Sequence, residues 1–124
     1  MKERDVEIAR EFLKRRTARR REHLQGRLVD ARRDFESIVE RLVRDFRPLR
    51  IYQWGSLLDE QRFSEISDID IAVEGLNDPL AGLRAAAEAQ ELTTFPVDLV
   101  ELERIDPLHA VSIRTKGRLV YERA

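Results

Sequence analysis

The sequence contains 124 residues, of which 42% are hydrophobic and 38% charged, with a net charge of −1 and no cysteine. This length suits a single domain, and the lack of cysteine excludes both disulfides and thiolate metal sites. No apolar run approaches the roughly 20 residues of a membrane span, and the charged N-terminal segment lacks the apolar core of a signal peptide, so we expect a cytoplasmic protein without a membrane partner.

Charge is distributed unevenly along the chain. Residues 1–50 hold 16 Lys and Arg against 10 Asp and Glu, whereas residues 51–124 hold 7 against 14. Such asymmetry can indicate nucleic acid or an acidic partner for the basic part. The acidic part has the composition that a carboxylate metal site requires.

Residues 1–47 are predicted to form a helical arm, as one long helix or as two. Apolar residues recur there at steps of three and four, which is the period of a helix with one apolar stripe. The stripe comprises Leu24, Leu28, Ala31, Phe35, Ile38, Val39, Leu42 and Phe46. We expect it to pack from about residue 24 onward on the sheet of a domain over residues 48–124. A helix from Asp5 to Phe46 would be roughly 60 Å long, so part of it must project or bend.

The start of the arm carries a run of arginines at positions 15, 16, 19, 20 and 21. They form either a solvated face paired with nearby glutamates or a surface that grips a second subunit, an acidic protein or RNA. No aromatic residues interleave with them, which argues against stacking on single-stranded nucleic acid. We predict an assembly surface over residues 5–25, with a homodimer as one form, whose apolar contacts are Val6, Ala9, Phe12 and Leu13.

The remainder of the chain alternates strands and helices. Strands are predicted at 50–54, 67–73, 95–102 and 118–122, a short helix from 57 to about 63, and longer helices at 80–89 and from 107 to about 115. Each longer helix follows a capping residue and a proline, at Asp78-Pro79 and Asp106-Pro107. This order predicts an α/β (α+β) domain with a small mixed sheet and flanking helices.

Acidic residues stand at two of the predicted strands. Successive side chains of a strand point to opposite faces, so Asp68 and Asp70 should share one face. Two carboxylates about 7 Å apart repel unless a cation lies between them, and hard oxygen ligands suit Mg²⁺. Asp98 stands alone among apolar residues of the strand 95–102, where burial without a partner would cost several kcal/mol. A metal shared by all three acids would supply that partner.

Gly55 and Ser56 form a predicted tight turn between the first strand and the short helix. Backbone N–H groups and the helix dipole favour anions at such a turn. A metal would then bridge bound phosphates to the carboxylates. The combination predicts a metal and phosphate site.

Each of these residues also has an ordinary structural interpretation. Ser56 could be a helix N-cap, Asp68 a turn residue and Asp70 the solvated side of an edge strand. Asp98 could form a structural ion pair with an arginine. Only the joint pattern favours a functional site.

In this pattern the chain resembles the minimal nucleotidyltransferase (MNT) group of the DNA polymerase β superfamily. That group has a Gly-Ser turn, an Asp-x-Asp strand about ten residues later and a third Asp on a later strand. The matching residues here are Gly55, Ser56, Asp68, Asp70 and Asp98, and the resemblance covers about residues 51–121. It implies a polymerase β-like nucleotidyltransferase fold, with the N-terminal arm outside it.

The resemblance also implies an activity. Asp68, Asp70 and Asp98 would be catalytic and hold two Mg²⁺ ions, with ATP as the donor of AMP to an acceptor hydroxyl. Gly55 and Ser56 would contact phosphate. Related proteins often have small and basic residues directly after Gly-Ser, whereas this chain has Leu-Leu-Asp-Glu-Gln-Arg at 57–62, so Arg62 is assigned as the phosphate-contacting cation.

MNT proteins often serve as antitoxins beside a HEPN toxin ribonuclease, and some adenylylate it. The resemblance therefore implies a HEPN-type toxin as partner, with one of its tyrosines as the acceptor. One alternative is a non-catalytic antitoxin that masks its toxin. The other is transfer to a small molecule, for which the chain lacks a second substrate domain.

Overall fold

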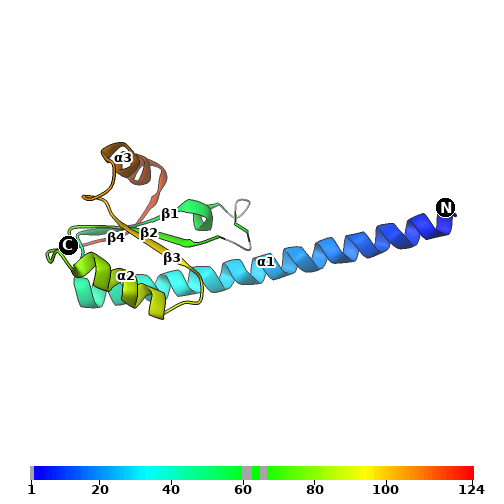
Figure 1. Ribbon diagram of the computed structural model, residues 1–124, viewed down its shortest axis with the longest axis horizontal. Helices are drawn as coiled ribbons and strands as arrows, with labels where there is room; N and C mark the ends of the chain where they lie inside the picture. The colour runs from blue at the N-terminus through cyan, green and yellow to red at the C-terminus, as the bar shows by residue number, and fades with distance from the viewer. Residues whose placement is uncertain (1, 60–62, 65–66) are drawn as a thin grey trace.

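The computed structural model describes residues 2–59, 63–64 and 67–124. In chain order its elements are α1 (Glu3–Phe46), β1 (Arg50–Trp54), the 3₁₀ helix η1 (Gly55–Leu58), β2 (Ile69–Glu74), α2 (Ala81–Glu91), β3 (Val97–Glu101), α3 (Pro107–Lys116) and β4 (Arg118–Glu122). This is the predicted order of helices and strands, and Figure 1 shows it along the chain. None of the described helices is long and apolar enough to cross a membrane.

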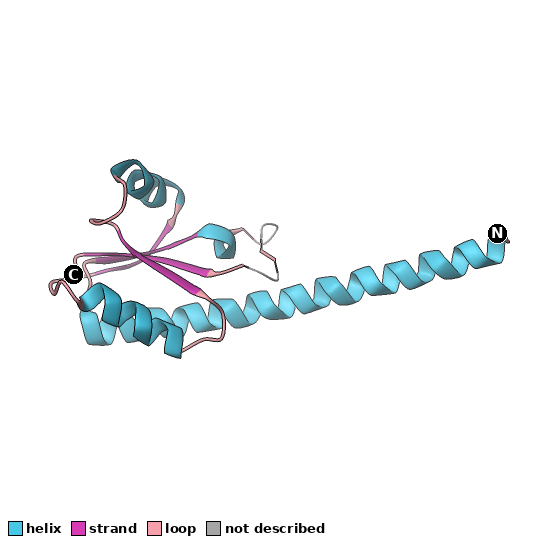
Figure 2. Ribbon diagram, viewed as in Figure 1, coloured by secondary structure: helices cyan, strands magenta, loops and turns pink. Residues whose placement is uncertain are grey.

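The four strands form one sheet in the order β3-β2-β1-β4. β1 is antiparallel to β2 and β4, whereas β2 and β3 are parallel and are joined by the crossover helix α2. α1 and α2 lie against one face of the sheet and α3 against the other (Figure 2). The predicted α+β fold with a small mixed sheet is confirmed.

α1 is one uninterrupted helix of 44 residues, about 66 Å long at 1.5 Å per residue. Its buried residues are Leu28, Ala31, Phe35, Ile38 and Leu42. They belong to the same core cluster as the β1 and β2 residues, so the predicted packing of the stripe on the sheet is confirmed. The part before residue 28 has no buried residue and projects from the domain (Figure 1).

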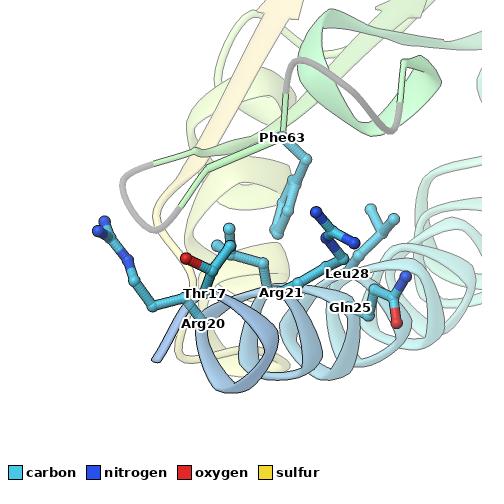
Figure 3. Close-up of a pocket in the computed structure, with 7 residues that line it drawn as sticks. Thr17, Arg20, Arg21, Gln25, Leu28 and Phe63 are labelled. Carbon is cyan, nitrogen blue, oxygen red and sulfur yellow. The ribbon is translucent and has the colours of Figure 1, made fainter. Parts of the chain in front are cut away.

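A cavity of about 590 Å³ lies where this projecting part leaves the domain. Phe63 points from the loop above toward α1, and the helix side is lined by residues that include Arg20, Arg21 and Leu24 (Figure 3). Leu24 is thus only partly buried, and the stripe begins to be fully covered at Leu28. The predicted division into an arm at 1–47 and a domain at 48–124 stays a prediction.

Alternation along β2 separates two kinds of side chain. Ile69, Ile71 and Val73 are buried in the cluster against α1, and Ala72 is buried in the cluster against α3. Asp70 and Glu74 are in phase with Ala72 and therefore lie on the α3 face. The side of the sheet that carries α3 is consequently the side that carries the acids.

Two predicted boundaries beside the site were wrong, and the strand predicted at 95–102 is the shorter β3 (Val97–Glu101). The short helix predicted from 57 to about 63 is the single turn η1 (Gly55–Leu58), after which Asp59 is extended. The second strand begins at Ile69 rather than at residue 67, because its pairing with the β3 side starts there, where the Ile69 N–H donates to the Pro96 carbonyl at 2.8 Å. Asp68 therefore lies just before the strand.

Glu74 ties the far end of β2 to two other elements. Its Oε1 accepts a hydrogen bond from Arg50 of β1 at 2.6 Å, and its Oε2 accepts from Arg114 of α3 at 2.8 Å. The Glu74 side chain is only 12% exposed. Burial by itself would raise the pKa of this carboxyl, but the hydrogen bonds from Arg114 and Arg50 outweigh it and hold the pKa below its usual value.

We expect Glu74→Gln to lower the free energy of unfolding by about 1–3 kcal/mol at pH 7, since it leaves two arginines without their shared anion. Because the folded-state pKa is lowered, this contribution is present above the ordinary glutamate pKa of 4.5 and is lost as the pH falls through the lowered value. Urea unfolding at pH 7 and pH 3 measures both effects. The control is Glu122→Gln, which removes a half-exposed partner of Arg50 and should cost under about 1 kcal/mol. Equal losses for the two variants would contradict the prediction.

Candidate functional site

Asp70 and Asp98 stand directly beside each other on the α3 face of the sheet. They are register partners in the parallel pair of β2 and β3. Adjacent strands lie about 4.8 Å apart and register partners point to the same face, so the two carboxylates come from neighbouring positions. The fold thus brings together two of the three acids that the sequence places about thirty positions apart.

Asp68 has a different position. It directly precedes β2 instead of lying within the strand, and its side chain is exposed. Its negative charge nevertheless acts on Asp70. Asp68 therefore lies at the rim of the site.

No basic residue within the described part of the chain neutralises the charge of this acidic group. Partial burial, then the charge of Asp98, then that of Asp68 raise the pKa of Asp70 to about 6. None of the three carboxylates forms an ion pair with any residue that the structure describes. Within the described part of the chain, the interpretation of Asp98 as a structural ion-pair partner is therefore not supported.

Asp98 is also exposed, contrary to the burial considered from its apolar neighbours. β3 is an edge strand of the sheet, and none of the other strands covers its outer side. A carboxylate there remains solvated, so it does not need a metal to compensate for desolvation. Its value to the site is its position beside Asp70.

Gly55 closes the site from the side of β1. Trp54, the residue before it, is the register partner of Asp70 on β1. Gly55 has a φ of +79°, and a Cβ built on it would overlap the carboxylate of Asp70, lying 2.8 Å from Cγ and 3.0 Å from Cβ. Only glycine allows this backbone conformation and this close approach. Sequence reasoning assigned Gly55 a role toward phosphate but did not reveal its close approach to Asp70.

Ser56 is the second residue of η1, and Trp54 is its N-cap, without a side-chain capping bond. The interpretation of Ser56 as the helix N-cap was therefore wrong. Its side chain is partly buried directly after the glycine. Arg62 lies outside the described residues.

An aromatic pair borders the acids on the same face. Trp54 meets His109 of α3 edge to face, with ring centroids 5.4 Å apart. The packing of α3 on the sheet thus holds Trp54 in place on the face that carries the acids.

A scan against models of protein families matches residues 36–124 to the model described as polymerase beta, nucleotidyltransferase. The chain belongs to this family. The match includes Gly55, Ser56 and the three acids, and it begins inside α1, so the nucleotidyltransferase match does not include the projecting part of that helix. A comparison with curated protein sequences found no match.

Solved structures with the nucleotidyltransferase fold of this chain come from toxin–antitoxin complexes. One, a toxin–antitoxin with AMP-PNP, has a TM-score of 0.59 and 28% identity over 71% of this chain and 73% of the other. The MntA–HepT toxin–antitoxin has a TM-score of 0.54 and 26% identity over 74% and 73%. A third, a tri-AMPylated Shewanella oneidensis HEPN toxin in complex with an MNT antitoxin, has a TM-score of 0.55 and 25% identity over 75% and 73%. The resemblance to MNT proteins is confirmed.

The donor set of this nucleotidyltransferase fits a hard divalent cation. Asp70 and Asp98 offer adjacent carboxylate oxygens, and the pKa of Asp70 is raised first by burial and then by the charges of Asp98 and Asp68, whose repulsion a cation would relieve. Across the described residues, no three His, Asp or Glu side chains are already gathered as a metal-binding group. Asp70 and Asp98 are therefore the candidate ligand pair, with Asp68 at the rim beside them.

Proposed function

We propose that this chain is a Mg²⁺-dependent nucleotidyltransferase that moves AMP from ATP to a hydroxyl group of a HEPN-type toxin and so acts as its antitoxin. The observation that carries the proposal is the pair of unneutralised carboxylates, Asp70 and Asp98, beneath the close approach of Gly55. The family match supports nucleotidyl transfer. The similar structures, one with AMP-PNP and one with an AMPylated HEPN toxin, favour this donor and this acceptor.

The proposed roles follow from the positions of the residues. Asp70 and Asp98, together with Asp68, would hold Mg²⁺, which when bound neutralises phosphate charge and polarises the phosphorus under attack. The backbone at Gly55 and the hydroxyl of Ser56 face the phosphate oxygens and orient the triphosphate. Arg62 is retained as the proposed phosphate-contacting cation.

Asp98 is exposed on the edge strand β3 and is therefore placed to receive the acceptor. Its carboxylate accepts the proton of the attacking hydroxyl. The hydroxyl oxygen forms a bond to the α-phosphorus, and the bond from that phosphorus to the bridging oxygen breaks. Pyrophosphate leaves with the electron pair of that bond, and AMP remains on the acceptor.

We expect Asp98→Asn to reduce transfer of AMP by at least about 100-fold, because amide oxygen neither holds a cation strongly nor accepts the proton. The mutated side chain is exposed, so the fold should be retained. The measurement is the mass of a purified HEPN partner after incubation with Mg²⁺ and each nucleoside triphosphate in turn. The matched control is Asp30→Asn, which changes an exposed acid of α1, the helix on the opposite face of the sheet (Figure 2).

A masking antitoxin without catalysis is the second candidate. It is favoured by the absence, among the residues described, of a three-ligand group already arranged for a metal. Under this hypothesis Asp98→Asn protects against toxin as well as the native protein does, and the mass of the partner never changes. Protection lost together with AMP transfer, while the complex still forms, would reject masking.

A further inference from the structure

The projecting part of α1 carries apolar side chains that nothing in the domain covers. Ile8, Phe12 and Leu13 are 60%, 58% and 57% exposed, and Ala9 beside them is exposed as well. They lie near the N-terminal end of the helix, far from the sheet (Figure 1). Large apolar residues that cluster on a solvated helix indicate a contact with another chain.

These residues share one helix face with a charged residue at each end. Steps of three and one along the chain keep all six positions on a single face. We call this the tip face: Asp5, Ile8, Ala9, Phe12, Leu13 and Arg16. The acidic Asp5 lies at the N-terminal end of the tip face and the basic Arg16 at its C-terminal end, and the four residues between them are apolar.

The tip face is complementary to itself when reversed. We place a twofold axis between positions 10 and 11 of two antiparallel copies. Each residue then lies at the same level as the residue of the other helix for which the two residue numbers add up to 21. Asp5 then faces Arg16, Ile8 faces Leu13, and Ala9 faces Phe12. The small alanine opposite the large phenylalanine allows the two helices to approach.

Within the tip face this antiparallel register brings no two like charges together. A parallel pair would instead place Asp5 against Asp5 and Arg16 against Arg16, which repel.

From this pattern we propose that two copies of the chain associate through their tip faces as an antiparallel helix pair. The overlap of 16 residues is about 24 Å long, which makes the contact smaller than a standard protein interface. The dimer should therefore be weak and sensitive to salt, with the apolar centre supplying most of its affinity and the charges its register. The family match begins at residue 36, so this surface is distinct from the nucleotidyltransferase site.

Sedimentation equilibrium of the full chain tests the proposal. The native protein should dimerise reversibly, with a dissociation constant below about 100 μM. Phe12→Ala with Leu13→Ala should weaken the dimer at least about tenfold. Asp5→Arg alone and Arg16→Asp alone should each weaken it, because each brings like charges together across the axis. Helical circular dichroism should remain unchanged in all of them, which shows that the arm is still folded.

Mixing the two charge-reversal variants is the decisive experiment. An equimolar mixture of Asp5→Arg and Arg16→Asp should associate as a heterodimer at close to native affinity, since every tip-face charge then meets its opposite. Glu22→Arg is the matched control: it makes the same kind of change on an exposed position outside the overlap and should have no effect. A native chain that stays monomeric, a mixture that does not recover, or a tip face that binds only a HEPN partner would overturn the proposal.

Discussion

Replacing Asp70 with Asn is expected to stabilise the metal-free protein at pH 7.5 by about 1–2 kcal/mol while it abolishes nucleotide transfer. The folded-state pKa of Asp70 is raised from 3.8 to about 6 by burial and by the charges of Asp98 and Asp68. Full linkage would give roughly 3 kcal/mol, but the carboxylate is partly solvated and the gain must be reduced accordingly. The ionised Asp70 carboxylate thus lowers the stability of the fold, first through its partial burial and then through repulsion from Asp98 and Asp68.

The sign of the pH dependence distinguishes this cause from others. Because the folded-state pKa of Asp70 is raised, the native protein is not penalised below pH 3.8 and becomes less stable as the pH rises through about 6. The advantage of Asp70→Asn should therefore be absent near pH 4 and complete above pH 7. Thermal unfolding across this range, in chelator, measures it.

Two comparisons complete the Asp70 experiment. Asp30→Asn changes an exposed acid of α1 and should show no such gain. Millimolar Mg²⁺ with ATP should raise the melting temperature of the native protein, because a ligand that binds only the folded state stabilises it. The melting temperature of Asp70→Asn should stay unchanged, because this variant lacks a proposed metal ligand. An Asp70→Asn protein that is less stable than native at pH 7.5 would show that the carboxylates are not in repulsion.

Gly55→Ala adds one methyl group to the site and is expected to reduce both stability and activity strongly. The new Cβ would overlap the carboxylate of Asp70, and the φ of +79° disfavours any side chain. We expect a loss of about 2–4 kcal/mol in the free energy of unfolding, from backbone strain together with displacement of the acid. Transfer activity should fall at least about 100-fold even in the fraction that folds, because the metal ligand is moved.

Gly26→Ala is the matched control. Gly26 lies inside α1, and a Cβ there would meet nothing within 4 Å. The same methyl group should therefore stabilise the protein by about 0.5–1 kcal/mol through helix propensity, without a change in activity. Urea unfolding and AMP transfer measured on both variants separate a local clash from a general effect of removing glycine. Similar effects of the two substitutions would contradict the assignment.

Periodicity was sufficient to predict most of the fold. The strand boundaries at 50–54 and 118–122 are those of β1 and β4, and the apolar stripe of α1 packs as its spacing indicates. Both follow from local patterns that burial on one side imposes. The helix at Gly55 was predicted too long because a single 3₁₀ turn has no period of its own to detect.

The site was predictable only in part, for a different reason. Asp70 and Asp98 could be assigned because strand phase determines the face of a residue. Asp68 could not be placed, because β2 starts only where its first bond to the neighbouring chain segment forms. The approach of Gly55 to Asp70 depends on how two strands pair, and a linear sequence does not contain that distance. The ion pairs of Glu74 with Arg50 and Arg114 were not predicted for the same reason, because they too depend on how separate elements pack.

The unbroken course of α1 sets a fixed spacing between the two functions of the molecule. One helix forms both the floor of the sheet and the projecting tip, without a hinge between them. From the proposed twofold axis to Leu28 is about 26 Å along the helix, so two paired copies would hold their domains roughly 50 Å apart. This separation would keep the two active sites from acting on one acceptor and would let them bind two separate acceptor molecules at once.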